Sequence, residues 1–204
     1  HILQVWKDYL SMAGKLRLDV YDSIIYRTSD LQRRHSEAVI QMEEKKKEIR
    51  RRELEEKYVG FQEQLIALKE KYEFSAGEYQ IVAPKSIDDI LYEGDTLHHC
   101  VNKTDNYFDR IASKESYILF LRKKENPEVP FYTLEAEPDG TIRQKRAEFD
   151  RQNKDIDEVT SFLRLWQKEI QKRLTQKDRK STEESRKLRQ QNYQEIRDKH
   201  VVVH

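Results

Sequence analysis

The chain has 204 residues, which suits one domain of ordinary size or a smaller domain with extensions. Charged residues make up 38% and hydrophobic residues 36%, against about 25% and 45–50% in a typical globular domain, so a large part of the chain is excluded from any core. The formal net charge of +1 predicts neither an anionic nor a cationic partner by itself.

The N-terminal part of the sequence predicts helices. Residues 3–18 place apolar side chains at mostly helical spacings, which predicts an amphipathic helix that needs a partner. From Leu31 to about Tyr72 the chain has no Pro and a single Gly, Gly60. We therefore expect one long helix, or a helical hairpin broken at Gly60, that begins after the N-cap signal Ser29-Asp30.

Residues 43–57 are the most charged part of this helical region. Thirteen of the fifteen residues are charged, and acids precede bases at i,i+4, a spacing that stabilises a helix by about 0.3 kcal/mol per pair. A basic clamp on nucleic acid is the alternative interpretation. Seven basic and six acidic residues nearly cancel, which favours a solvated helix.

A compact part begins near Gly77. Residues 79–82 predict a short strand, and Ser86 opens a helix with Asp89 three residues on, a variant of the capping box. Gly94-Asp95 is expected to end that helix. Thr96 then caps a helix that carries residues 97–101, and Asp105 begins another short one.

Three strands follow in the sequence. Residues 117–122 are almost continuously apolar, as in a strand covered on both faces, and residues 131–136 begin aromatic and end alternating. The turn residues 137–140, EPDG, connect that segment to a third strand at 141–146, which predicts an antiparallel meander. A helix from about Ile156 has a strong apolar face that can cover the sheet.

These elements predict an α+β protein in three parts. A helical region with the long charged helix spans residues 1–76. A compact α+β domain spans 77–172, with a small antiparallel sheet of three to four strands covered by helices. A basic C-terminal arm, helical or disordered, spans 173–204.

The single cysteine excludes an intramolecular disulfide and favours a reducing compartment. No stretch approaches about 18 consecutive apolar residues, and the N-terminus lacks the charged-then-apolar pattern of a signal peptide. We therefore expect a cytoplasmic protein without a membrane segment. Because the sequence begins with His1 rather than Met, we also expect it to be a piece of something longer.

The stretch LHHCV at 97–101 joins the only cysteine to two histidines. A nucleophilic Cys100 needs a base, but consecutive residues on a helix point about 100° apart, so His99 is poorly placed for that role. A metal site is disfavoured because zinc patterns separate their ligands and supply four of them. The third interpretation is that Leu97, Cys100 and Val101 face a core together, with Cys100 as a buried anchor.

A polar cluster across the sheet is a further candidate site, with His99, Arg122 and Tyr132 around it. Strand alternation puts Gln144 and Arg146 on one face of the last strand and Arg143 and Lys145 on the other. The same group serves equally as a satisfied polar network. The candidate catalytic residues are therefore His99, Cys100, Glu135, Gln144 and Arg146.

The C-terminal arm is the candidate binding surface. Residues 171–200 hold ten Lys or Arg and five acids, a net charge of +5, which suits nucleic acid or another anionic partner, although the acids dilute the case. No helix-turn-helix or zinc-finger motif is present, so only non-specific phosphate contact is expected. The candidate residues are Lys172, Arg173, Lys177, Arg179, Lys180, Arg186, Lys187 and Arg189.

The order of motifs resembles the core of the PcfJ-like family. L-H-H-C-V is followed by Tyr107, then by Y-I-L-F-L-R, a P-x-x-P loop with F-Y-T-L-E, and a strand that ends Q-K-R. The N-terminal W-K-D-Y-L-S-M-A-G-K-L and the later D-L-Q-R-R-H are also similar to that family. The resemblance covers roughly residues 3–170. It is most specific at 97–135.

The resemblance implies a setting in Gram-positive conjugative plasmids and related mobile elements, and it brings no established catalytic residues. We therefore expect a PcfJ-like accessory or interaction protein that acts around DNA transfer or processing, with DNA-processing or conjugation proteins as partners. An enzyme with a site around His99 and Cys100, near the antiparallel sheet, is the alternative. Neither hypothesis requires a cofactor or a metal.

Overall fold

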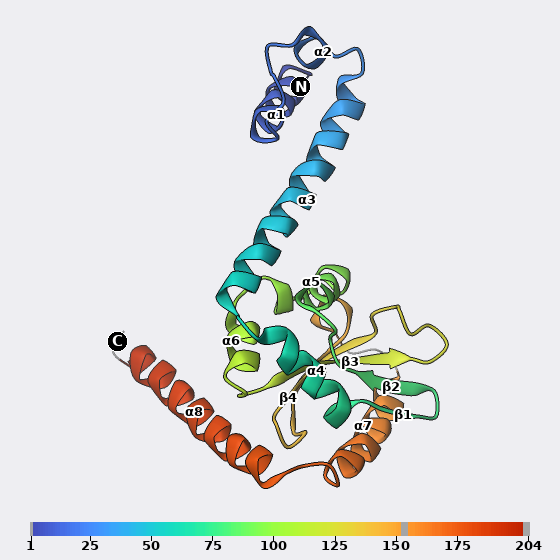
Figure 1. The fold of residues 1–204 in the computed structure, drawn as a ribbon, viewed down its shortest axis with the longest axis vertical. Helices are drawn as coiled ribbons and strands as arrows, with labels where there is room; N and C mark the ends of the chain where they lie inside the picture. Colours follow the sequence, from blue (N-terminus) through green and yellow to red (C-terminus); the bar gives the residue numbers. More distant parts are fainter. Residues whose placement is uncertain (1, 152–154, 202–204) are drawn as a thin grey trace. The chain divides into compact units, whose positions relative to one another are not determined.

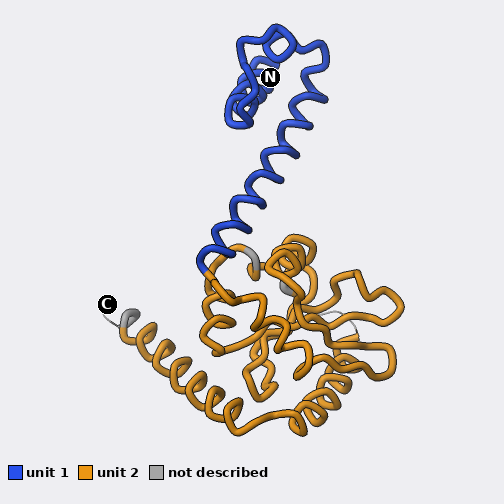
Figure 2. The backbone as a smooth tube through the Cα atoms, viewed as in Figure 1, with its two compact units in different colours: residues 1–57 blue, residues 58–204 orange. Residues whose placement is uncertain are grey.

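The computed structural model describes residues 2–151 and 155–201. The chain forms two compact units, residues 1–57 and residues 58–204 (Figure 2). The three-part division at residues 76 and 172 concerns separately folding domains and stays a prediction. Each unit is described by itself.

The first unit is a helical hairpin in which α1 packs along α3. Tyr9 and Ala13 of α1 are buried, so α3 supplies the partner that the amphipathic pattern required. Asp30 accepts a hydrogen bond from the backbone N of Arg33 at 3.1 Å, which confirms the cap signal. The elements are α1 (Ile2–Lys15), α2 (Ser23–Tyr26) and α3 (Leu31–Lys57).

The second unit begins with Tyr58, and its first helix is α4 (Phe61–Tyr72). Gly60 precedes α4 with φ +78°, a left-handed conformation that glycine adopts without strain, so the predicted break falls at this residue. Five antiparallel strands follow in the order β1-β2-β3-β4-β5. Their bounds are β1 Phe74–Ala76, β2 Tyr79–Val82, β3 Tyr117–Lys123, β4 Tyr132–Ala136 and β5 Ile142–Arg146.

The α+β class is confirmed, but the predicted count of three to four strands is wrong. The additional strand is β1, which pairs with β2 across Gly77 at φ +55°. With three residues, β1 is too short to show the alternation of apolar and polar residues that identifies a strand. It also lies directly after a helix. The four predicted strands are β2 to β5.

Helices cover both faces of the sheet (Figure 1). On one face, Arg122 of β3 pairs with Glu93 of α5 (Ile87–Thr96), and α6 (Asn106–Ala112) packs on the same strand. On the other face, Tyr79 of β2 contacts the ring of Phe162 in α7 (Ile156–Ile170). The sheet core therefore lies between α5 and α6 on one side and α7 on the other.

The last helix, α8 (Gln176–Val201), packs through polar side chains. Asp178, Thr182 and Ser185 are buried at i, i+4 and i+7 on one face. Asp178 accepts hydrogen bonds from Thr175 N and Oγ1, and it forms an ion pair with Lys71 Nζ at 2.5 Å. The arm that the sequence left as helical or disordered is therefore a helix anchored at its first turn.

None of the helices in the described ranges is both long and apolar enough to cross a membrane.

Candidate functional site

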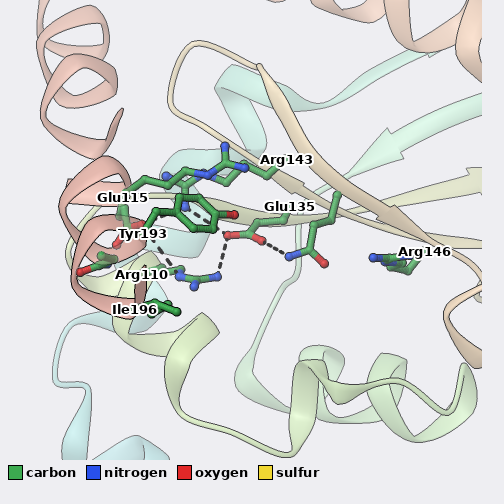
Figure 3. A pocket seen from close by; sticks show the side chains of 10 residues that line it. Arg110, Glu115, Glu135, Arg143, Arg146, Tyr193 and Ile196 are labelled. Carbon is green, nitrogen blue, oxygen red and sulfur yellow. Dashed lines mark hydrogen bonds and ion pairs between the residues drawn. The ribbon is translucent and has the colours of Figure 1, made fainter. Parts of the chain in front are cut away.

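Glu135 of β4 is the centre of a polar cluster at the β5 edge of the sheet (Figure 3). Its carboxylate accepts hydrogen bonds from Gln144 Nε2 at 3.1 Å, from Arg110 Nη1 at 3.0 Å and from Ser116 Oγ at 2.6 Å. The residue is only 3% exposed. The structure therefore brings Glu135 and Gln144 together, on one face of neighbouring strands, as alternation predicted.

Arg143 is in this cluster because β5 is irregular. Glu135 pairs with Gln144 and Ala136 pairs with Ile142, so Arg143 is an extra residue in the ladder. Strict alternation would put Arg143 on the face opposite Gln144, and that prediction is wrong. The bulge lets Arg143 reach the same carboxylate, with Nη1 at 3.4 Å from Glu135 Oε1.

Arg143 connects three carboxylates to each other. Besides Glu135, it contacts Glu115 Oε1 at 2.8 Å through Nη1 and Glu137 Oε1 at 3.2 Å through Nε. Burial lowers the pKa of the Arg143 guanidinium, but these acidic partners outweigh burial and hold it above its ordinary value. The network is compensated internally, as expected for buried charges.

A cavity of about 400 Å³ opens beside this network (Figure 3). The sheet and α6 supply charged walls, and α8 adds Tyr193 and Ile196, each 53% exposed. Four arginines face two glutamates, so the lining carries a positive excess. The lining residues are Arg110, Glu115, Glu135, Arg143, Gln144, Arg146, Arg189, Asn192, Tyr193 and Ile196.

The His-His-Cys stretch is not helical, which corrects the geometric argument made from the sequence. The helix predicted to end at Gly94-Asp95 continues to Thr96, His98 has φ +53° and His99 is extended. Phe149 donates its backbone N–H to the carbonyl of Leu97 at 2.8 Å and stacks on the ring of His98. Only a single 3-10 turn, η1 (Cys100–Asn102), follows.

His99 is buried and faces a chain of polar groups. Its Nε2 lies 2.8 Å from Thr133 Oγ1, which donates to Glu93 Oε1 at 3.0 Å, and Glu93 pairs with Arg122. Burial is the largest influence on Glu93 and raises its pKa, against the opposing effect of Arg122. Tyr132, beside Thr133 in the strand, points to the opposite face and does not join the cluster.

Cys100 is exposed, so the expectation of a buried anchor is wrong. Leu97 and Val101 are buried, as predicted. The Sγ of Cys100 lies 3.6 Å from the hydroxyl of Tyr107, whose pKa is raised by burial and by this contact. A small hollow of about 20 Å³ is lined by all five candidate catalytic residues: His99, Cys100, Glu135, Gln144 and Arg146.

Among the described side chains, no group of three His, Cys, Asp or Glu residues is arranged to hold a metal ion.

The arm residues divide into inward and outward sets. Arg186 Nε contacts Glu137 Oε2 at 3.0 Å, and Arg189 Nη1 lies 3.7 Å from Glu137 Oε1. Arg173 donates to the carbonyl of Glu73, and Lys172 pairs with Glu169 at 2.7 Å. Of the eight candidate cations, four are exposed with neither a carboxylate pair nor a carbonyl hydrogen bond in the described ranges: Lys177, Arg179, Lys180 and Lys187.

A family model described as PcfJ-like protein matches residues 5–160. The chain belongs to the PcfJ-like family. The match covers both units and ends within α7, so it includes the polar cluster's strands and excludes α8. The resemblance inferred from the motifs is confirmed.

One relative of this PcfJ-like chain is a protein of Listeria innocua serovar 6a (strain ATCC BAA-680 / CLIP 11262) that is described as uncharacterised. The two are 27% identical over 139 residues, which is 68% of this chain and 28% of the relative. The chain therefore spans about 28% of the length of the curated relative it matches. No solved structure matches the chain.

Several residues of the polar cluster around Glu135 and of the polar chain beside His99 were missed from the sequence. Arg110 and Glu115 come from α6 and the loop after it, where charged residues beside apolar anchors carry no local signal. Glu137 was interpreted only as part of the EPDG turn. Glu93 was hidden in a helix, and its burial became evident only from its pairing with Arg122.

Proposed function

We propose that this PcfJ-like chain is an accessory binding module of a conjugative or mobile element that contacts nucleic acid around DNA transfer or processing, in the cytoplasm. The contact is non-specific and electrostatic, and it is made by the outward face of α8. DNA-processing or conjugation proteins are the partners that fit this role. Family membership supports the setting, and the charges of α8 support the contact.

The proposal rests on a difference between the cations of α8: some pair with an acid of the domain, and others are exposed without a carboxylate partner in the described ranges. Arg186 and Arg189 hold the helix on the domain through Glu137, so part of their charge is already paired within the chain. Lys177, Lys180 and Lys187 lie at i, i+3 and i+10, on one side of the helix over about 15 Å. Exposed cations in such a row suit a phosphate backbone.

The acids on the same helix limit the contact to a weak, general one. Glu183 and Glu184 are exposed between Lys180 and Lys187 and reduce the local positive charge. Binding that depends on a few phosphate contacts weakens steeply as salt rises. We therefore expect binding at low ionic strength that is lost at moderate salt.

The test uses fluorescence anisotropy with labelled single- and double-stranded oligonucleotides. The test variant replaces Lys177, Arg179, Lys180 and Lys187 with Gln. The control variant makes the same charge change at exposed lysines elsewhere: Lys7, Lys46, Lys69 and Lys124.

The wild-type chain and the control should bind at low salt, and the α8 variant should bind at least about tenfold more weakly with a shallower salt dependence. Equal affinities of the two variants would remove α8 from the proposal. The absence of binding by the wild-type chain would overturn the proposal itself.

A second candidate function is catalysis around His99 and Cys100. One observation favours it: the five candidate residues line a single hollow, and the thiol of Cys100 is exposed beside it. The hollow has room for about one water molecule, so a substrate would approach from outside. Arg146 and Gln144 would then face the reacting group.

This second function is tested by the rate at which iodoacetamide alkylates Cys100 near neutral pH. A nucleophile predicts a rate above that of a free thiol compound, because activation requires more thiolate. A Cys100→Ser variant identifies the labelled site. A rate at or below that of the free thiol would exclude Cys100 as an activated nucleophile.

A further inference from the structure

A second cavity, of about 480 Å³, lies between β5 and α7. Four of its lining side chains are cationic, and no carboxylate belongs to the lining. Four others are neutral groups that donate hydrogen bonds. The lining residues are Thr141, Ile142, Arg143, Gln144, Lys145, Arg146, Thr160, Leu163, Arg164 and Gln167.

Lys145 is a half-buried cation with a neutral partner. Its Nζ donates to Thr160 Oγ1 at 2.9 Å, and that hydroxyl in turn donates to the carbonyl of Ile156 at 2.7 Å. Thr160 therefore orients the ammonium group but leaves its charge uncompensated. Across the described part of the chain, Lys145 has no carboxylate partner.

Arg164 supplies a second uncompensated charge from α7. It is exposed, and the residues three and four positions away on the helix are Thr160, Ser161, Gln167 and Lys168, none of them acidic. Within the described ranges it has no carboxylate partner either. Lys145 and Arg164 therefore line one cavity with two positive charges that no side chain there neutralises.

Arg143 has a different role in this lining. Its guanidinium is held by Glu115, Glu135 and Glu137 on the other side of β5, so it contributes shape more than free charge. Gln167 Nε2 donates to the carbonyl of Gly140 at 2.9 Å, which fixes the floor beside the turn. Other bonds thus hold Lys145, Gln167 and Arg143 in place, whereas Arg164 is exposed.

We propose that the cavity between β5 and α7 binds a phosphate group, with Lys145 and Arg164 contacting its oxygens. An anion with several oxygens matches two cations that line one cavity together with hydroxyl and amide donors. The volume of about 480 Å³ leaves room beside the phosphate for the rest of a larger molecule. Two sources share this chemistry: a free nucleotide and the phosphodiester backbone of a nucleic acid.

This site is separate from the outward face of α8, so the two proposals can be tested independently with different variants. The variants are Arg164→Gln and the double variant Lys145→Gln with Arg164→Gln. The control is Lys168→Gln, which removes an exposed charge one turn further along α7 and outside the lining. Circular dichroism first checks that each variant is folded. Arg164 is exposed, so Arg164→Gln is expected to fold and provides the test if the double variant does not fold.

The probes are ADP, by calorimetry, and a labelled twelve-residue oligothymidylate, by anisotropy, both at low salt. The wild-type chain and Lys168→Gln should bind at least one probe, Arg164→Gln should bind it about three- to tenfold more weakly, and the double variant more weakly still. ADP binding that weakens in Arg164→Gln identifies a free nucleotide as the source. Oligonucleotide binding that weakens in Arg164→Gln, without ADP binding, identifies a nucleic-acid backbone.

The proposal is overturned if the wild-type chain binds neither probe, or if Arg164→Gln binds as tightly as Lys168→Gln. The four-residue α8 variant separates the two proposals. If oligonucleotide binding is lost in that variant but not in the cavity variants, and no ADP binding depends on Arg164, the α8 proposal stands and the cavity proposal is overturned. Loss of oligonucleotide binding in the cavity variants but not in the α8 variant supports the cavity proposal and overturns the α8 proposal.

Discussion

Arg143 donates a hydrogen bond from Nη2 to the Oγ of Ser185 over 2.6 Å, and this contact joins the outer strand of the sheet to α8. The Ser185 hydroxyl in turn donates to the carbonyl of Glu115 at 2.9 Å. Since Arg143 also contacts three carboxylates, one side chain connects β4, β5, the loop after α6 and the C-terminal helix. The polar cluster is therefore part of the fold as well as a wall of the cavity.

Replacing Arg143 with Met should lower the free energy of unfolding by about 3 kcal/mol or more, because it leaves buried carboxylates without their shared cation. Urea unfolding measures the change. Arg164→Met removes an exposed arginine and should stay within about 0.5 kcal/mol of wild type. Equal losses in the two variants would contradict the role given to Arg143.

Replacing Arg122 with Met should destabilise the chain by about 3–5 kcal/mol at neutral pH, because Glu93 would be a buried charge without a partner. The pKa of Glu93 is already raised by burial, so protonation relieves the cost. A group with a raised pKa stabilises the fold at low pH and loses that contribution as pH rises. The deficit of the variant should therefore shrink as pH falls toward the ordinary value of 4.5. A deficit that does not change with pH would exclude Glu93 as its cause.

Gly140→Ala should be more destabilising than Gly77→Ala. Both glycines have positive φ, +83° and +55°, so each alanine meets backbone strain of about 1–2 kcal/mol. At Gly140 the new Cβ would also overlap Ile170, whereas at Gly77 it meets no atom within 4 Å. Thermal unfolding should show an extra loss of about 1–3 kcal/mol for Gly140→Ala. Equal losses would mean that Ile170 moves aside freely.

Asp178→Asn should lower the free energy of unfolding, measured with urea, by about 1–2 kcal/mol at neutral pH, because it weakens the attachment of α8. Burial alone would raise the pKa of Asp178, but Lys71 and Thr175 outweigh it and hold the pKa below 3.8. A lowered pKa stabilises the fold above the ordinary value and loses that contribution as pH falls through the folded value. The difference from wild type should thus be full at neutral pH, begin to fall near pH 3.8 and vanish only below the lowered pKa of folded Asp178. Asp157→Asn replaces an exposed acid in α7 and should change the free energy of unfolding at neutral pH by less than about 0.5 kcal/mol.

The sequence predicted most of the second unit because its signals are local. The side chain of Ser86 accepts from the backbone N of Asp89 at 3.3 Å, and Gly60 falls at a helix boundary, where capping and glycine rules apply without tertiary information. The His-His-Cys stretch was wrongly predicted as helical. Its conformation depends on Phe149, about fifty residues away, and no local pattern contains that contact.

The site was predicted in part for the same reason. Strand alternation was sufficient to bring Glu135 and Gln144 together, since both strands had been identified. A bulge is not visible in a five-residue polar strand, so Arg143 was assigned to the wrong face. Arg110 and Glu115 enter the cluster from α6 and its loop, and only tertiary packing places them there.

We propose that this chain contacts phosphate at two surfaces, the outward face of α8 and the cavity between β5 and α7. An NMR titration of the ¹⁵N-labelled chain at low salt, once with a single-stranded oligonucleotide and once with ADP, distinguishes these surfaces from the rest of the chain. We expect amide shift changes along α8 near Lys180 and Lys187 with the oligonucleotide, and in the cavity near Lys145 and Arg164 with at least one of the two probes. The absence of shift changes in both titrations, or changes confined to residues 97–111 around His99 and Cys100, would contradict both proposals.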